Sequence, residues 1–231
     1  MKKVLIVSAH PEKASFCMSL KQTAVDYFVQ KGYEVRESDL YALHFDPVGN
    51  KSDFKSISNP DFFKYQLEQV HASENNLFVD ELKAEMEKLE WCDVLMFNFP
   101  MWWFGMPAIL KGWIDRVFAM GFVYGAGKGV YENGIYANKT AFITLTTGGP
   151  MQAYGQSGKN GDINTLLYPI HHGVFYFTGM TVLPPFISFG PARSTIDELN
   201  DEIKRYREYL NNIDNLKPIY TNREDDLILR L

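Results

Sequence analysis

The stretch SAHPEKASF, residues 8–16, follows an apolar run and contains side chains that could bind an anion. His10 and Ser15 carry hydrogen-bonding groups, and the backbone N–H groups at the start of a following helix would add the positive end of its dipole. The stretch lacks both the GxGxxG dinucleotide fingerprint and the GxxxxGK[ST] phosphate loop. Two interpretations therefore stand: a turn that binds phosphate, or a capped helix beside a structural histidine.

The stretch FNFPMWWFGMPAILKGWIDRVF, residues 97–118, places an unusual amount of aromatic surface in a turn. It begins like a buried strand and ends like a helix, yet its middle holds two tryptophans, a phenylalanine, a glycine and two prolines. Connecting segments normally run over the surface, and large apolar groups are usually kept out of water. A loop this aromatic indicates a flat partner.

The third stretch, TLTTGGPMQAYGQSGKNGD at residues 144–162, contains two adjacent glycines. Gly148 and Gly149 would let backbone N–H groups approach a planar ligand closely, although a glycine pair alone also fits an ordinary tight turn. The three stretches together describe a site for a flat ring that bears a phosphate. A flavin fits this description best.

Alternating strands and helices are expected to position these stretches. The hydrophobic periodicity predicts strands over residues 4–9, 34–40, 93–99, 140–146 and 181–189, the last interrupted by Pro184 and Pro185. It predicts helices over residues 16–28, 82–89, 107–117, 165–177 and 195–210. This alternation indicates an α/β fold with a doubly wound parallel sheet, in which ligands bind beyond the carboxyl ends of the strands.

Composition limits the classes of function. The 231 residues are 46% hydrophobic, 22% charged and 15% aromatic, which suits one globular domain with a large core. The net charge of -5 argues against bulk binding of nucleic acid or anionic lipid. Cys17 and Cys92 form no CxxC motif, and the apolar run in MKKVLIVSAH is too short for a signal peptide or an integral membrane segment. We expect a cytoplasmic protein.

The chain resembles the NAD(P)H quinone oxidoreductase family, which includes the DT-diaphorase and quinone reductase 2 branches of the flavodoxin-like superfamily. The resemblance runs from KKVLIVSAH to ISF near residue 189, and its strongest motifs are FNFPMWWFGMPAILKGWIDRV, TLTTGG, residues 154–162 and YPIHHGVFYFTG. It implies a flavodoxin-like sheet of strand order 2-1-3-4-5. It also implies a flavin-binding catalytic domain at residues 1–210 and a C-terminal tail at residues 211–231, whose end NREDDLILRL fits a surface or inter-subunit segment.

By this resemblance the cofactor is FAD in preference to FMN. The residues implied to bind it are His10, Ser15, Phe16, Cys17, Pro100, Met101, Trp102, Trp103, Phe104, Thr146, Thr147, Gly148, Gly149 and Tyr154. Cys17 stands where the mammalian members carry asparagine. Relatives contact the adenine across a dimer through the segment equivalent to SNPDFFKY, residues 58–65, where Lys64 replaces their amide.

The resemblance also implies the reacting residues. Tyr154 matches the active-site tyrosine, and Asn160 stands where DT-diaphorase carries a histidine and the quinone reductase 2 branch an asparagine. Because that branch prefers small dihydronicotinamides, the choice between NADH, NADPH and a truncated donor stays open. The residues implied to bind substrate are Tyr124, Gly148, Gly149, Tyr154, Asn160 and Phe177, of which Phe177 could instead belong to the core.

The implied activity is two-electron hydride transfer from reduced nicotinamide through bound FAD to a quinone, by a ping-pong mechanism. A homodimer is expected, with aromatic residues of YPIHHGVFYF at the interface. Two alternatives are a flavodoxin-like one-electron carrier and an ancillary regulatory flavoprotein of a potassium efflux system. Those regulators are shorter, so the extra region at residues 43–80 favours the oxidoreductase.

Paired histidines, His171 and His172, raise the question of a metal. The quinone reductase 2 branch binds zinc through two histidines and a C-terminal cysteine. Here Tyr176 occupies the second histidine position and the tail contains no cysteine. Because too few ligands remain, we expect no metal.

Overall fold

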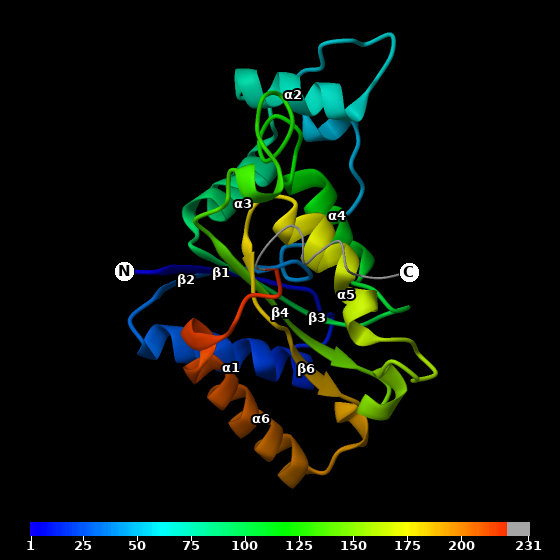
Figure 1. Cartoon of the computed structure of the whole chain (residues 1–231). Coiled ribbons are helices and arrows are strands. Elements are labelled where there is room, and N and C mark those ends of the chain that lie inside the picture. Colours follow the sequence, from blue (N-terminus) through cyan, green and yellow to red (C-terminus); the bar gives the residue numbers. More distant parts are fainter. Residues whose placement is uncertain (221–231) are drawn as a thin grey trace.

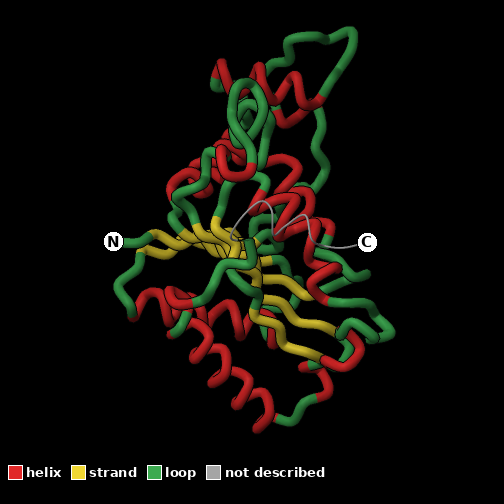
Figure 2. The backbone as a smooth tube through the Cα atoms, in the orientation of Figure 1, coloured by secondary structure: helices red, strands yellow, loops and turns green. Residues whose placement is uncertain are grey.

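A twisted parallel sheet forms the centre of the protein in the computed structural model, which describes residues 1–220 (Figures 1 and 2). Its strands are β1 (Lys3–Ser8), β2 (Glu34–Asp39), β3 (Val94–Pro100), β4 (Thr140–Thr147), β5 (Thr181–Val182) and β6 (Phe186–Phe189). The strand order is β2-β1-β3-β4-β5, β6 also pairs with β4, and every pair is parallel. The predicted order 2-1-3-4-5 is confirmed.

Helices cover both faces of this sheet (Figure 1). Helices α1 (Phe16–Gln30) and α6 (Ile196–Asn211) lie on one face, and α3 (Asp80–Trp91), α4 (Ala108–Val117) and α5 (Ile163–Ile170) lie on the other. Because both faces are covered, the central strands β1, β3 and β4 are almost continuously buried and apolar. The edge strand β2 has the polar sequence EVRESD.

Local side chains set the starts of the two helices on the first face. The Ser15 hydroxyl accepts a hydrogen bond from the Met18 amide and caps α1. Thr195 and Glu198 form a capping box at the start of α6. These caps fix the helix starts that flank the carboxyl edge of the sheet.

Prolines alter two of the predicted elements. Pro184 and Pro185 have no N–H to donate, so the predicted strand at residues 181–189 is divided into β5 and β6. The predicted helix at residues 165–177 is α5 followed by a π-helix at His171–Tyr176. This change of hydrogen-bonding pattern comes directly after Pro169, which likewise cannot donate.

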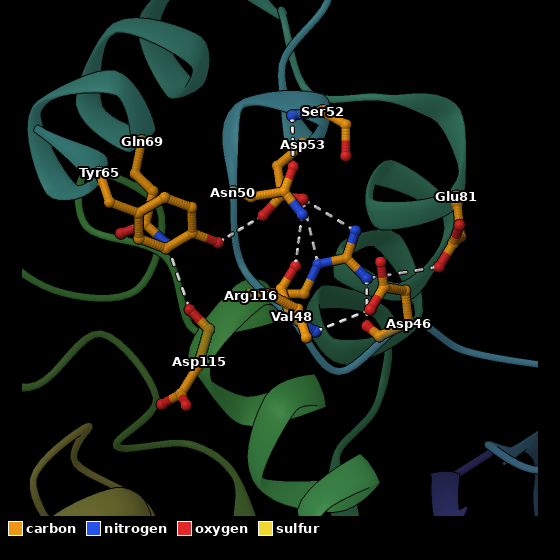
Figure 3. Close-up of polar contacts among 10 residues, drawn as sticks. All are labelled: Asp46, Val48, Asn50, Ser52, Asp53, Tyr65, Gln69, Glu81, Asp115 and Arg116. Carbon is orange, nitrogen blue, oxygen red and sulfur yellow. Dashed lines mark hydrogen bonds and ion pairs between the residues drawn. The ribbon is translucent and has the colours of Figure 1, made fainter. Parts of the chain in front are cut away.

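Residues 43–80 carry a helix that the sequence did not predict, α2 (Tyr65–Asn75). Figure 1 shows α2 outside the layer of α3 and α4, away from the sheet. Asp53 ends the short 3₁₀ helix Lys51–Asp53 and joins this region to α4. Its Oδ1 lies 2.9 Å from Nη2 of Arg116, and its other oxygen accepts a hydrogen bond from Tyr65 (Figure 3). The ion pair and hydrogen bond fix the extra region to the helix layer.

The end of the described chain returns to the sheet. A short 3₁₀ helix, Ile213–Asn215, follows α6, and the Ile219 amide donates to the Val182 carbonyl. The sequence NREDDLILRL lies outside the described residues. Within residues 1–220, no helix is long and apolar enough to cross a bilayer.

Candidate active site

A cavity of about 560 Å³ opens at the carboxyl edge of the sheet. Its lining includes ten predicted cofactor residues: His10, Ser15, Phe16, Cys17, Pro100, Met101, Trp102, Thr146, Thr147 and Gly148. These residues come from the ends of β1, β3 and β4, three segments far apart in the sequence. The other predicted cofactor residues, Trp103, Phe104, Gly149 and Tyr154, adjoin this lining without forming part of it.

A fourth segment completes the lining and was missed by sequence reasoning. Pro191, Ala192, Ser194 and Leu199 follow β6 and lead into α6. Only their position in the sequence could have identified them. A parallel strand that ends near residue 189 places the residues after it at the same edge of the sheet as the other strand ends. Their types alone carry no chemical motif.

The aromatic loop makes a tight, strained turn at the cavity mouth. Trp102 and Gly105 exchange two backbone hydrogen bonds, each 3.0 Å long, around Trp103 and Phe104. These two residues have φ angles of 50° and 60°, a region that bulky side chains rarely adopt and that costs about 1–3 kcal/mol each. The Met101 amide also donates to the Thr146 carbonyl at 2.8 Å and joins the loop to the end of β4. Such strain is typical of functional sites, and here the turn leaves Trp103 97% exposed.

The β1 end of the cavity presents hydrogen-bond donors. The Glu12 amide donates to Nδ1 of His10 at 3.0 Å, which places the proton of a neutral imidazole on Nε2. Ser15 caps the Met18 amide, and the first amides of α1, at Phe16 and Cys17, have no acceptor within the helix. This arrangement suits an anionic group.

Cys17 lies at the floor of the cavity and is nearly buried. Burial raises the pKa of its thiol to about 12, against the opposing effect of hydrogen bonds from Thr146 and Asn98. The Asn98 side-chain nitrogen lies 3.4 Å from the Cys17 sulfur, while its Oδ1 is buried without a partner among the described residues. The thiol is therefore held neutral at the floor of the cavity.

Tyr154 and Asn160 meet at Gly149. A Cβ built on Gly149 would lie 3.4 Å from the Tyr154 hydroxyl oxygen and 3.2 Å from the Asn160 side-chain nitrogen. The backbone amide of Asn160 donates to the Ala153 carbonyl. The Tyr154 ring packs on Phe189, with ring centroids 5.7 Å apart. The two residues predicted to react are thus beside the second glycine of TTGG, where a Cβ would make unusually tight contact with both.

Tyr124 and Phe177, the other predicted substrate residues, lie in a second cavity. Their rings are 5.8 Å apart, and both line a space of about 420 Å³ between α4 and the π-helix. Neither residue lines the cavity at the carboxyl edge. The structure therefore does not bring them to the predicted flavin site of this chain.

The two adjacent histidines occupy different environments. His171 is buried in the protein interior, and burial lowers its pKa to about 4. His172 stacks on Tyr168 at 4.6 Å and also contacts Tyr131, Tyr176 and Tyr220. Within residues 1–220, no three His, Cys, Asp or Glu side chains gather in a way that could hold a metal ion.

The sheet order and the cavity beside its switch point between β1 and β3 define an α/β protein of flavodoxin type. A family model described as the flavodoxin-like fold matches residues 2–210. Ribosyldihydronicotinamide dehydrogenase (quinone) of Rattus norvegicus is 39% identical over 220 residues, or 95% of each chain. NAD(P)H dehydrogenase (quinone) 1 of Cavia porcellus is 38% identical over 221 residues, covering 95% of this chain and 80% of that protein.

A solved structure gives the same result. A Klebsiella pneumoniae protein assigned as a quinone reductase superposes with a TM-score of 0.92 and 36% identity, covering 96% of this chain and 89% of that one. The chain belongs to the NAD(P)H quinone oxidoreductase family, as its motifs predicted. The expectation that it is an enzyme is confirmed as well.

Proposed function

We propose that the protein is a flavin-dependent NAD(P)H:quinone oxidoreductase. The observation that carries this proposal is the cavity where the aromatic loop, the His10 turn and the TTGG loop meet. The rat and guinea pig relatives, both named as quinone dehydrogenases, support the same acceptor class.

The cavity residues fit a flavin. His10, Ser15 and the first amides of α1 offer donors for its phosphate, and Trp102 offers an aromatic surface for its ring. When bound, a flavin supplies two-electron chemistry, accepting a hydride from a reduced nicotinamide and passing it to a quinone in a ping-pong sequence. The amides of Gly148 and Gly149 would stabilise negative charge at the ring edge.

Tyr154 and Asn160 are proposed to act beside these amides. The Tyr154 hydroxyl can donate a hydrogen bond to the ring edge or to a quinone carbonyl. Asn160 can position a substrate, but its amide cannot take up a proton. The donor is proposed to be a reduced nicotinamide, either NADH, NADPH or a truncated form.

FAD is the proposed form of the cofactor. By the family resemblance, the segment at residues 58–65 contacts the adenine, which FMN lacks. This segment belongs to the extra region at residues 43–80, which the buried pair Asp53–Arg116 joins to α4. Glu68 accepts three hydrogen bonds from Ser58 and Asn59 and so orders that segment. Mass spectrometry of the cofactor released by heat is expected to show FAD, and FMN alone would contradict this assignment.

A homodimer is proposed as the active unit. Trp103 is 97% exposed and Phe104 46%, so large apolar groups face outward beside the cavity. A second copy could bring its Tyr124 and Phe177 to this cavity, which one protomer does not do. Light scattering is expected to show a dimer, and a fully active monomer would contradict the assignment.

The activity itself has a simple test. The purified protein is assayed with NADH, NADPH and a truncated dihydronicotinamide against menadione, with and without its flavin. We expect flavin-dependent quinone turnover with at least one donor. No turnover with any donor would contradict the proposal and favour an electron carrier or an efflux regulator. A cytoplasmic location, which the two free thiols Cys17 and Cys92 support, is part of the proposal and is tested by cell fractionation.

A further inference from the structure

Helix α2 is anchored on α4 by buried polar contacts (Figure 3). The Arg116 and Asp53 side chains are 3% and 0% exposed, and their ion pair is extended by the hydrogen bond from Tyr65 at the start of α2. Gln69, also buried, donates from Nε2 to the Asp115 carbonyl at 3.2 Å. Because these groups are removed from water, breaking their contacts is costly. Helix α2 therefore has a fixed position relative to α4.

The same helix holds the turn that carries Tyr124. Oε1 of Gln69 accepts a hydrogen bond from the Met120 amide at 3.1 Å. The Gly121 amide closes the turn by donating to the Tyr124 carbonyl at 2.7 Å. Gly121 has a φ of 85°, and a Cβ there would lie 3.0 Å from Cα of Val70 on α2. The backbone of Tyr124 is thereby set by its packing against α2.

Gln66 of α2 reaches the Tyr124 side chain itself. Its Nε2 donates to the Tyr124 hydroxyl oxygen at 3.0 Å, while the edge of the ring meets Phe177. A phenol oxygen that accepts this bond keeps its own proton for donation to another group. The Gln66 side chain, which lies at the surface, thus favours the orientation in which the hydroxyl proton points away from it.

We propose that Gln66 is a positioning residue that holds Tyr124 as a hydrogen-bond donor to a carbonyl oxygen of the quinone. The inference rests on the proposed function and its homodimer, in which Tyr124 of one copy contacts the substrate bound in the cavity of the other. Helix α2 then acts on the substrate site as well as ordering the segment at residues 58–65, because it orients the group that recognises a carbonyl oxygen.

The test compares Gln66→Glu with the wild type. A carboxylate of nearly the same shape can only accept, so the Tyr124 proton turns toward it and is lost to the substrate. We expect kcat/KM for menadione to fall about fivefold, since the carbonyl oxygen gains negative charge as it is reduced and a hydrogen bond to it stabilises the transition state. Gln22→Glu makes the same chemical change on an exposed part of α1 and should leave kcat/KM unchanged.

A double-mutant cycle separates positioning from a general loss of structure. Tyr124→Phe should lower kcat/KM for menadione by about the same fivefold, and Gln66→Glu should add nothing in that background. Equal melting temperatures and flavin contents in all variants are expected. An unchanged kcat/KM for menadione in Gln66→Glu, or additive effects in the cycle, would overturn this inference alone. A wild-type protein that reduces no quinone would overturn the proposed function and this inference with it.

Discussion

Tyr154 is held beside Gly149 by contacts that do not use its hydroxyl. Its side chain is buried and its ring packs on Phe189, while the hydroxyl oxygen faces the second glycine of TTGG. Removing the hydroxyl should therefore leave the fold and the flavin in place. This separation of packing from chemistry makes the residue suitable for a kinetic test.

We expect Tyr154→Phe to slow flavin reduction or quinone turnover by roughly tenfold, a barrier increase of about 1.4 kcal/mol. A sole donor in such a site is worth about a hundredfold or more, but the amides of Gly148 and Gly149 share the task. Rapid-mixing rates for the two half-reactions measure the effect. Wild-type rates in both would remove Tyr154 from the mechanism, and an equal flavin content is the control.

Cys17 should resist alkylation while the protein is folded. Its pKa, raised to about 12 by burial, leaves about a thousandfold less thiolate at pH 8 than an ordinary thiol of pKa 9. We expect mass spectrometry after iodoacetamide treatment to find Cys17 unmodified in the folded protein and labelled after denaturation. Labelling of the folded protein at the rate of a free thiol would show that the cavity floor is open. Cys92 is buried away from the cavity, and burial raises its pKa to about 11. It should also stay unmodified in the folded protein, so labelling of both cysteines would indicate unfolding.

His171 predicts a loss of stability in mild acid. Its pKa is lowered from 6.5 to about 4 in the folded protein, so the unfolded chain binds the proton more readily. The stability that comes from burying His171 in its neutral form is fully present above pH 6.5. The free energy of unfolding falls by about 3 kcal/mol as the pH drops toward 4. Urea unfolding across this range should show the decline, and His171→Leu should show a shallower one. Parallel curves for the two proteins would contradict this account.

At the scale of elements, the apolar patterns predicted the strands and most of the helices because those faces meet the core. Helix α2 escaped prediction because its buried face is mostly polar: it buries Glu68 and Gln69 and only one apolar residue, Ala72. Its position is specified by hydrogen bonds to other segments, which no periodicity along the chain reveals. The last predicted strand is divided because Pro184 and Pro185 have no N–H to donate. The π-helix likewise follows Pro169, which has no N–H either.

The buried pair should be the main support of the extra region. We expect Arg116→Met to lower the free energy of unfolding by about 3–5 kcal/mol, because it leaves the Asp53 carboxylate buried without its counter-ion. Lys111→Ala removes an exposed ion pair with Asp115 on the same helix and should cost less than about 1 kcal/mol. Denaturant titrations compare the two variants, and equal losses would contradict the role given to the buried pair.

At the scale of the whole molecule, the site is assembled from strand ends, and this is why much of it could be predicted. The motifs after β1, β3 and β4 were recognisable in sequence, and a parallel sheet brings their ends to one edge. The residues after β6 carry no motif and were found only in the structure. Tyr124 and Phe177 share a different cavity, so their proposed place in the active site depends on a second copy.

The cavity at the carboxyl edge of the sheet is proposed to hold a flavin that exchanges electrons with both substrates in turn. The most direct test is anaerobic stopped-flow absorbance of the purified holoprotein, mixed first with NADH, NADPH or a truncated dihydronicotinamide and then with menadione. We predict that the visible flavin absorbance is lost in the first step with at least one donor and returns in the second, both at rates no slower than steady-state turnover. A flavin absorbance that no donor bleaches, or that menadione does not restore, would contradict the account.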